Sequence, residues 1–106
     1  METHDNPLTV AEFEELMKGD LPVLVDFYAT WCEPCAYLDG ILHELEAMPG
    51  LKARIVKLDV DRQQELTSTL GIRSVPTLMI YKNGTMAWRM AGFKLAHELA
   101  AEIEKC

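Results

Sequence analysis

The chain has 106 residues, of which 49% are hydrophobic and 25% charged, and a formal net charge of -7 at pH 7. This length and composition predict one globular domain over residues 1–106 and argue against a disordered or fibrous protein. The chain has no basic cluster to neutralise phosphates, which argues against nucleic acid or an anionic membrane as a partner. Residues 1–6 lack the basic and apolar regions of a signal peptide, and no apolar run is long enough to span a membrane, so we expect a cytoplasmic protein.

The first half of the chain predicts two helices on either side of a central strand. Residues 9–12 have the pattern of a capping box and begin a helix from about Val10 to Lys18. Residues 21–29 are almost continuously apolar, as in a strand covered on both faces, with Asp26 as the exception. The helix that follows has apolar residues at three- and four-residue spacing: Leu38, Ile41, Leu42, Leu45 and Met48.

The second half begins with further alternation of strand and helix. Residues 53–60 are typical of a strand, and residues 63–70 of a short helix that ends at Gly71. Residues 78–81 form another predicted strand. The Asn-Gly pair at residues 83–84 is the strongest short hairpin signal, so we expect residues 85–91 to return antiparallel.

The return strand and the end of the chain complete the predicted fold. Met86, Trp88 and Met90 alternate along the return strand and are expected on one of its faces. A closing helix is indicated by an apolar stripe of Leu95, Leu99 and Ile103. The order of elements predicts an α/β fold, in which a mixed sheet carries helices on both faces.

Two cysteines stand where the central strand passes into the long helix. The free backbone N–H groups and the positive end of the dipole at a helix start stabilise a thiolate. We therefore expect Cys32 to be a nucleophile and Cys35, one turn deeper, to be the resolving thiol. Pro34 suits the first helical turn because its missing N–H would have no partner there. The segment is typical of a redox site.

Zinc binding is the competing use of a Cys-x-x-Cys pair. A structural zinc needs four ligands, and the remaining candidates, His4, His43, His97 and Cys106, do not have metal-ligand spacing, so we expect no metal. Cys106 cannot pair within the site without disrupting it. We interpret it as a free, exposed thiol prone to intermolecular oxidation, with a regulatory role as the alternative.

The chain resembles the thioredoxin family in residues 26–35, Asp-Phe-Tyr-Ala-Thr-Trp-Cys-Glu-Pro-Cys, and in residues 75–77, Val-Pro-Thr. The usual family pair encloses Gly-Pro where this chain has Glu-Pro. The resemblance runs the whole length and implies a thioredoxin fold, with a central mixed β-sheet flanked by helices on both faces. The family's additional N-terminal strand would lie before Thr9, where the sequence pattern assigns no element.

The resemblance implies roles for two charged residues on the central strands. Asp26 lies where the family keeps a buried carboxylate behind the resolving cysteine, and burial would raise its pKa so that it takes the proton from Cys35. A partly exposed aspartate at a strand end is the alternative. Lys57 falls where the family places a lysine near that carboxylate, although a surface lysine on an alternating strand is also consistent with the pattern.

The same resemblance implies a substrate-binding surface beside the cysteines. Pro76 matches the family's cis-proline, and the backbone of Ser74 and Val75 would pair with an extended substrate segment. Trp31 would pack beside the first cysteine, and Gly92 would let a partner chain approach closely. The alternatives are core packing for Trp31 and a turn glycine for Gly92.

The activity implied by the resemblance is protein-disulfide reduction by dithiol-disulfide exchange, in cell redox homeostasis. The protein would need no cofactor of its own, since the family usually takes electrons from a flavoenzyme reductase that uses NADPH. We expect a monomer that acts on disulfide-containing proteins. The alternatives are a member dedicated to one partner or acting as an oxidant or isomerase, and a subunit that clamps another protein regardless of redox state.

Redox tuning by the residues between the cysteines is expected to differ from the usual pattern. Glu33 places a carboxylate beside Cys32, where it repels a thiolate, and Ala36 stands where many thioredoxins have a basic residue. Both changes destabilise the thiolate of the reduced protein and so favour the disulfide. We therefore expect the Cys32–Cys35 couple to have a potential on the reducing side. Together with Pro34, Glu33 is the predicted tuning position.

Overall fold

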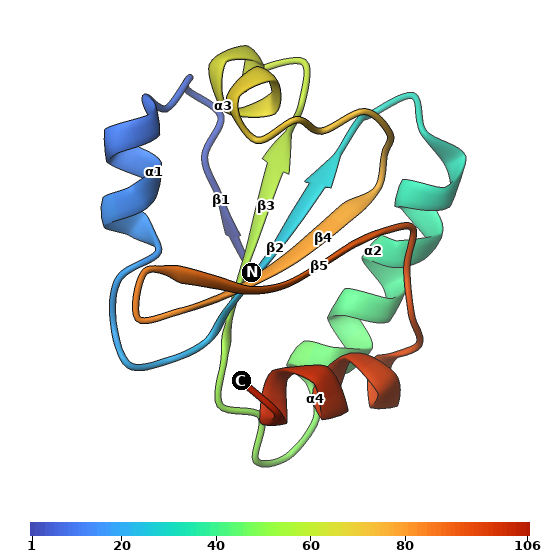
Figure 1. Ribbon diagram of the computed structural model, residues 1–106. Helices are drawn as coiled ribbons and strands as arrows, with labels where there is room; N and C mark the ends of the chain where they lie inside the picture. Colours follow the sequence, from blue (N-terminus) through green and yellow to red (C-terminus); the bar gives the residue numbers. More distant parts are fainter.

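The computed structural model describes residues 1–106 and has one five-stranded sheet in the order β1-β3-β2-β4-β5 (Figure 1). β3 pairs in parallel with β1 and β2, whereas β4 runs antiparallel to both β2 and β5. The predicted mixed α/β sheet is confirmed. The elements are β1 (Glu2–Thr3), α1 (Val10–Leu16), β2 (Val23–Tyr28), α2 (Glu33–Glu46), β3 (Arg54–Asp59), α3 (Gln64–Thr69), β4 (Thr77–Lys82), β5 (Thr85–Ala91) and α4 (Ala96–Glu104).

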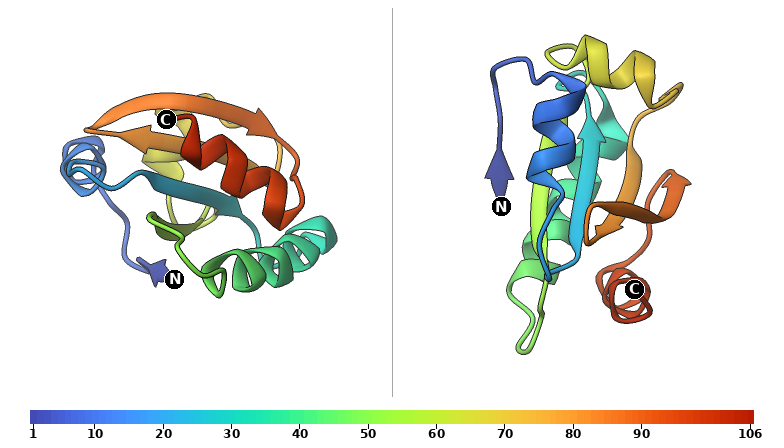
Figure 2. Two further views of the ribbon diagram at one scale, coloured as in Figure 1. Left: turned by 90° about the horizontal axis from the view of Figure 1, so that it is seen from below. Right: turned by 60° about the vertical axis from the view of Figure 1, so that its left-hand side comes forward.

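The helices cover the two faces of the sheet, α2 and α4 on one side and α1 and α3 on the other (Figures 1 and 2). Alternate residues of the central strand therefore enter different cores: Val23, Val25 and Phe27 face α1 and α3, while Leu24 faces α2 and α4. Strand β2 is buried throughout as far as Phe27, which explains its continuous apolar sequence. None of the four helices has the length and apolar character needed to cross a membrane.

Strand β1 is the element that the sequence pattern did not assign. It has only two residues, too few for any periodicity, and it pairs with Val56 and Lys57 of β3. The guanidinium of Arg54 also donates two hydrogen bonds of 2.8 Å to the Glu2 carboxylate. Contacts with a strand distant in sequence therefore define this edge of the sheet.

The β4–β5 hairpin has the predicted Asn83-Gly84 turn, with φ angles of 52° and 80° that asparagine and glycine tolerate best. The alternation predicted along β5 is wrong at its start. Met86 pairs with Tyr81, but the next pairing joins Trp88 to Ile80. The intervening residue is bulged out of the ladder, so Met86 and Trp88 lie on opposite faces.

Two helix boundaries also differ from the sequence prediction. Helix α1 ends at Leu16 rather than Lys18. Leu95, predicted as part of the buried stripe of the last helix, precedes α4 as its N-cap and is 45% exposed. Its backbone N–H donates to the Glu98 carboxylate at 2.8 Å, so its position is fixed by helix capping rather than by core packing.

Candidate active site

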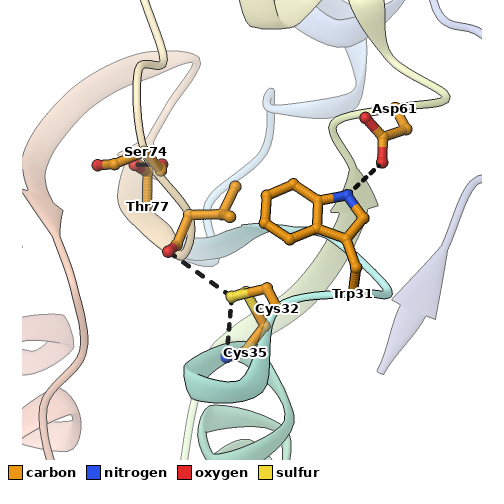
Figure 3. Close-up of a disulfide and its surroundings, with 7 residues drawn as sticks. Trp31, Cys32, Cys35, Asp61, Ser74 and Thr77 are labelled. Atoms are coloured by element: carbon orange, nitrogen blue, oxygen red, sulfur yellow. Dashed lines mark hydrogen bonds between the residues drawn. A yellow bond between two sulfur atoms is a disulfide. The ribbon is translucent and has the colours of Figure 1, made fainter.

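The cysteine pair lies at the start of α2, where Cys32 is the N-cap residue. The two cysteines are joined by a disulfide with Cα atoms 5.2 Å apart, and both are buried. The backbone N–H of Cys35 donates to the Cys32 Sγ at 3.2 Å (Figure 3). Glu33 and Pro34 occupy the first turn between them. The first sulfur thus receives an N–H that has no partner within the helix, an arrangement that favours negative charge on Cys32 in the reduced protein.

The loop before β4 lies against the same sulfur. The Cys32 Sγ is 3.7 Å from the carbonyl oxygen of Val75 (dashed line in Figure 3). The peptide bond between Val75 and Pro76 is cis. The Thr77 hydroxyl donates to the Ser74 carbonyl at 2.7 Å, which fixes the entry into the strand. The Val75 N–H makes no hydrogen bond within the protein. This loop therefore presents an unused backbone donor beside the cysteines.

Trp31 and Gly92 flank the cysteines and the loop. Core packing of Trp31 is wrong: its side chain is 71% exposed, and the indole Nε1 donates to Asp61 Oδ2 at 2.9 Å (Figure 3). The backbone N–H of Gly92 donates to the Pro76 carbonyl at 2.8 Å. The φ of Gly92 is 104°, a conformation that other residues rarely adopt, so its backbone needs glycine whatever a partner requires.

Asp26 is completely buried on β2, and neither carboxylate oxygen has a hydrogen-bond partner. The alternative of a partly exposed strand-end aspartate is therefore wrong. Loss of hydration raises the pKa of Asp26 to about 7, the positive charge of Lys57 lowers it, and the negative charge of Asp39 raises it. A carboxyl group with this pKa can exchange a proton near neutral pH.

Lys57 is the β3 residue that pairs in register with Asp26, and its side chain is only 16% exposed. It is therefore not a surface lysine. Its ammonium does not bond to Asp26, however, but to Asp39 Oδ1 on α2. It also lies 4.5 Å from the centre of the Tyr28 ring. The lysine stands beside the buried carboxylate in the sheet while its charge is held by the helix.

Two acidic residues of this region, Asp61 and Asp39, were not identified from the sequence. Asp61 follows the end of β3, which lies parallel to β2, so the chain order of elements could have placed it near Trp31. Asp39 stands on a helix whose apolar stripe gave no indication of a polar contact with the sheet. Its partner is 18 residues away on β3, and only the packing of α2 on the sheet brings the two together.

A surface hollow of about 700 Å³ lies at the opposite end of the central strands from the cysteines. It is lined by the segments that precede β2 and β3 and by the end of α4, whereas the cysteines follow the carboxyl end of β2. Cys106 lines this hollow and is half-buried rather than exposed, and burial raises the pKa of its thiol. No group of three or more potential metal ligands is found in the structure.

The family model for thioredoxin matches residues 5–105. The chain belongs to the thioredoxin family. It is 40% identical over 96 residues to a thioredoxin of Alicyclobacillus acidocaldarius, with 91% of each chain covered. Its structure matches a mutant thioredoxin from Halobacterium salinarum with a TM-score of 0.78 at 34% identity, covering 99% of this chain and 94% of the other.

A third match is to the oxidised form of mitochondrial thioredoxin 3 from Saccharomyces cerevisiae. The TM-score is 0.81 at 29% identity, over 100% of this chain and 95% of the other. The predicted thioredoxin fold is therefore confirmed. Family membership and the Cys32–Cys35 disulfide together show a thiol-disulfide oxidoreductase, a protein-disulfide reductase of the thioredoxin type.

Proposed function

We propose that Cys32 is the attacking thiolate of this thioredoxin, Cys35 the resolving thiol and Asp26 the proton acceptor. The Cys32 thiolate attacks one sulfur of a substrate disulfide, and the other sulfur leaves as a thiolate. Asp26 then takes the proton of the Cys35 thiol while the Cys35 sulfur attacks the Cys32 sulfur of the mixed disulfide. The second substrate thiolate leaves, and the two cysteines are left as an intramolecular disulfide. Two electrons have passed from the dithiol to the substrate.

The observation that carries this assignment is the environment of the Cys32 sulfur. It accepts the Cys35 N–H at 3.2 Å at the start of α2 and lies 3.7 Å from the carbonyl oxygen of Val75, a residue whose own N–H makes no hydrogen bond within the protein. In the proposed complex, an extended substrate segment pairs with the backbone of Ser74 and Val75 next to Pro76. The exposed face of Trp31 and the backbone at Gly92 border this segment. Lys57 limits the rise in the pKa of Asp26.

The electron donor in this proposal is a thioredoxin reductase-like flavoenzyme that uses NADPH, so the flavin and the nicotinamide belong to the partner. We place the protein in the cytoplasm as a monomer whose residues 1–106 form one domain. The bacterial relative supports this compartment. The formal charge of -7 supports protein partners over nucleic acid or anionic membranes.

The assignment of the two thiols is tested with single variants that are first reduced, freed of reductant and then mixed with a protein disulfide substrate. Cys32→Ser should abolish disulfide reduction. Cys35→Ser should instead trap a covalent mixed disulfide that is visible on a non-reducing gel and released by dithiothreitol. Cys106→Ser is the matched control, since it removes a thiol outside the site. Trapping by Cys32→Ser rather than Cys35→Ser would reverse the two roles.

The direction of the reaction is tested by measuring the reduction potential of the Cys32–Cys35 couple in equilibrium with thiol-disulfide buffers. The measurement uses the Cys106→Ser variant, so that the active-site couple is the only one that titrates. A potential near the value of about -270 mV that is typical of thioredoxin supports a reductase. A potential above about -200 mV would contradict it and favour an oxidant or isomerase.

A further inference from the structure

Asp26 and Lys57 are placed so that they would be expected to form an ion pair. They are partners in the parallel register of β2 and β3, and parallel register puts their side chains on the same face of the sheet, under α2. Both oxygens of Asp26 nevertheless lack a hydrogen-bond partner, although the residue is completely buried. The nearest cation in the sheet is engaged elsewhere, which requires an explanation because a buried unpaired carboxylate is unfavourable.

Asp39 supplies that explanation. It lies one turn after Cys35 on α2, and its Oδ1 accepts a hydrogen bond from the Lys57 ammonium. Its other oxygen, Oδ2, is 3.5 Å from Nδ1 of His43, one further turn along the helix. The same His43 nitrogen lies 2.8 Å from the Asp39 backbone carbonyl, so the imidazole lies against both the backbone and the carboxylate of Asp39.

Lys57 has a second contact, with Tyr28, that keeps its ammonium near the end of β2. Its ammonium lies 4.5 Å from the centre of the Tyr28 ring, two residues beyond Asp26 on β2. The side chains of Lys57 and Asp39 are 16% and 35% exposed, so water screens their attraction only partly. Two groups thus hold the ammonium toward the end of β2, the Asp39 carboxylate and the Tyr28 ring.

We propose that Asp39 is a positioning residue of the active site, which holds the Lys57 ammonium against α2 and so leaves the buried Asp26 carboxylate without a cationic partner. This inference rests on the proposed role of Asp26 as the proton acceptor. When Cys35 attacks the mixed disulfide, its proton moves to an Asp26 oxygen and its sulfur forms the new bond to Cys32. The bond between Cys32 and the substrate sulfur breaks, and the substrate leaves as a thiolate. An unpaired carboxylate is a stronger base for this step than one paired with an ammonium.

The charged and titratable groups near Asp26 define what must be measured. Lys57 on β3 and Asp39 on α2 act on the Asp26 carboxyl with opposite signs, and Tyr28 lies on its own strand. The β4 residue opposite Asp26 is Leu78, which carries no charge. Removing Asp39 has two effects on Asp26: it deletes a repelling charge, and it frees the lysine. A test must separate these effects.

The experiment follows the Asp26 carboxyl carbon by NMR through a pH titration of the oxidised protein. Asp39→Asn should lower the titration midpoint of Asp26 by about one pH unit or more, because the released ammonium turns to the carboxylate. Glu44→Gln is the matched control, a loss of the same charge from an exposed position of the same helix, and should leave the midpoint unchanged.

Lys57→Met separates the two effects. In a Lys57→Met background there is no ammonium to release, so Asp39→Asn should shift the midpoint by less than about half of its effect in the natural protein. Equal shifts in the two backgrounds would show direct charge repulsion alone and overturn the proposal, as would an unchanged midpoint in Asp39→Asn.

A kinetic readout tests the consequence of this positioning. The pH profile of mixed-disulfide resolution should move to lower pH in Asp39→Asn in step with the Asp26 midpoint, and a profile that stays in place would contradict the inference. The titration uses no substrate. A failure of disulfide reduction in the natural protein would therefore count against the proposed function, while the titration judges the role of Asp39.

Discussion

Trp31 and Asp61 are joined by a hydrogen bond of 2.9 Å between the indole Nε1 and Oδ2, although they stand 30 residues apart. The tryptophan follows β2 and the aspartate follows β3. Because these strands are parallel, their carboxyl ends lie at the same edge of the sheet. The bond fixes a large, exposed aromatic ring beside the disulfide (Figure 3).

Loss of the Trp31–Asp61 bond should affect substrate use more than stability. Asp61→Ala releases the ring, and we expect kcat/KM for a protein disulfide to fall several-fold. The free energy of unfolding should change by less than about 1 kcal/mol, because the bond is solvent-exposed. Asp61→Asn keeps an acceptor oxygen and should retain most of the activity. An equal loss in both variants would mean that the charge of Asp61, rather than its bond to the indole, matters.

The buried Asp26 should make stability depend on pH. Its pKa is about 7 in the folded protein, against about 3.9 in an unfolded chain. Between these values the unfolded chain has released the proton that the folded protein keeps, so the free energy of unfolding falls as pH rises from about 4 to about 7. The full loss is about 4 kcal/mol and is complete above the folded pKa.

Asp26→Asn removes this titration and should be more stable than the natural protein at pH 8 by up to about 4 kcal/mol, with the difference disappearing near pH 4. Denaturant unfolding at several pH values measures it. A stability difference that stays constant with pH would argue against a raised pKa for Asp26. Resolution of the mixed disulfide should slow in the same variant, since the proton acceptor is lost.

Glu33, one of the two residues between the cysteines, is expected to set part of the redox potential. Glu33 is the first residue of α2 and directly follows Cys32 in the chain. Replacing it with Gly removes the repulsion, stabilises the thiolate and should raise the potential of the couple by about 10–20 mV. Glu33→Gln should give most of the same change, because it removes the charge without adding backbone flexibility. A lower potential in either variant would contradict the expected sign.

Gly92 should tolerate substitution poorly because of its backbone conformation. Its φ is 104°, whereas a Cβ placed there would meet nothing nearer than the Met90 Cε at 3.9 Å. Gly92→Ala should therefore lower the free energy of unfolding by about 1–2 kcal/mol through backbone strain. Gly40→Ala is the matched control: Gly40 lies within α2 with open space around it, and alanine should stabilise it by about 0.5–1 kcal/mol. Thermal unfolding of both variants measures the contrast.

The sequence alone determined the features that depend on local pattern. Three features are each encoded within a few residues: the almost continuous apolar run of residues 21–29 that contains β2, the Cys-x-x-Cys at a strand-to-helix junction, and the Asn83-Gly84 turn. Burial of Asp26 also followed from its apolar neighbours and from the family resemblance. Strand periodicity, helix capping and turn conformation are short-range effects, so a single sequence carries them.

Only the tertiary structure decided which distant side chains meet. The two-residue strand at Glu2, the bulge that separates Met86 from Trp88 and the exposed position of Trp31 have no local signature. The strongest case is Lys57, which the register places beside a buried carboxylate but which bonds to Asp39 instead. Which ion pair forms depends on how α2 packs against the sheet. A charged group with several possible partners pairs with the one for which the electrostatic attraction most exceeds the cost of desolvation.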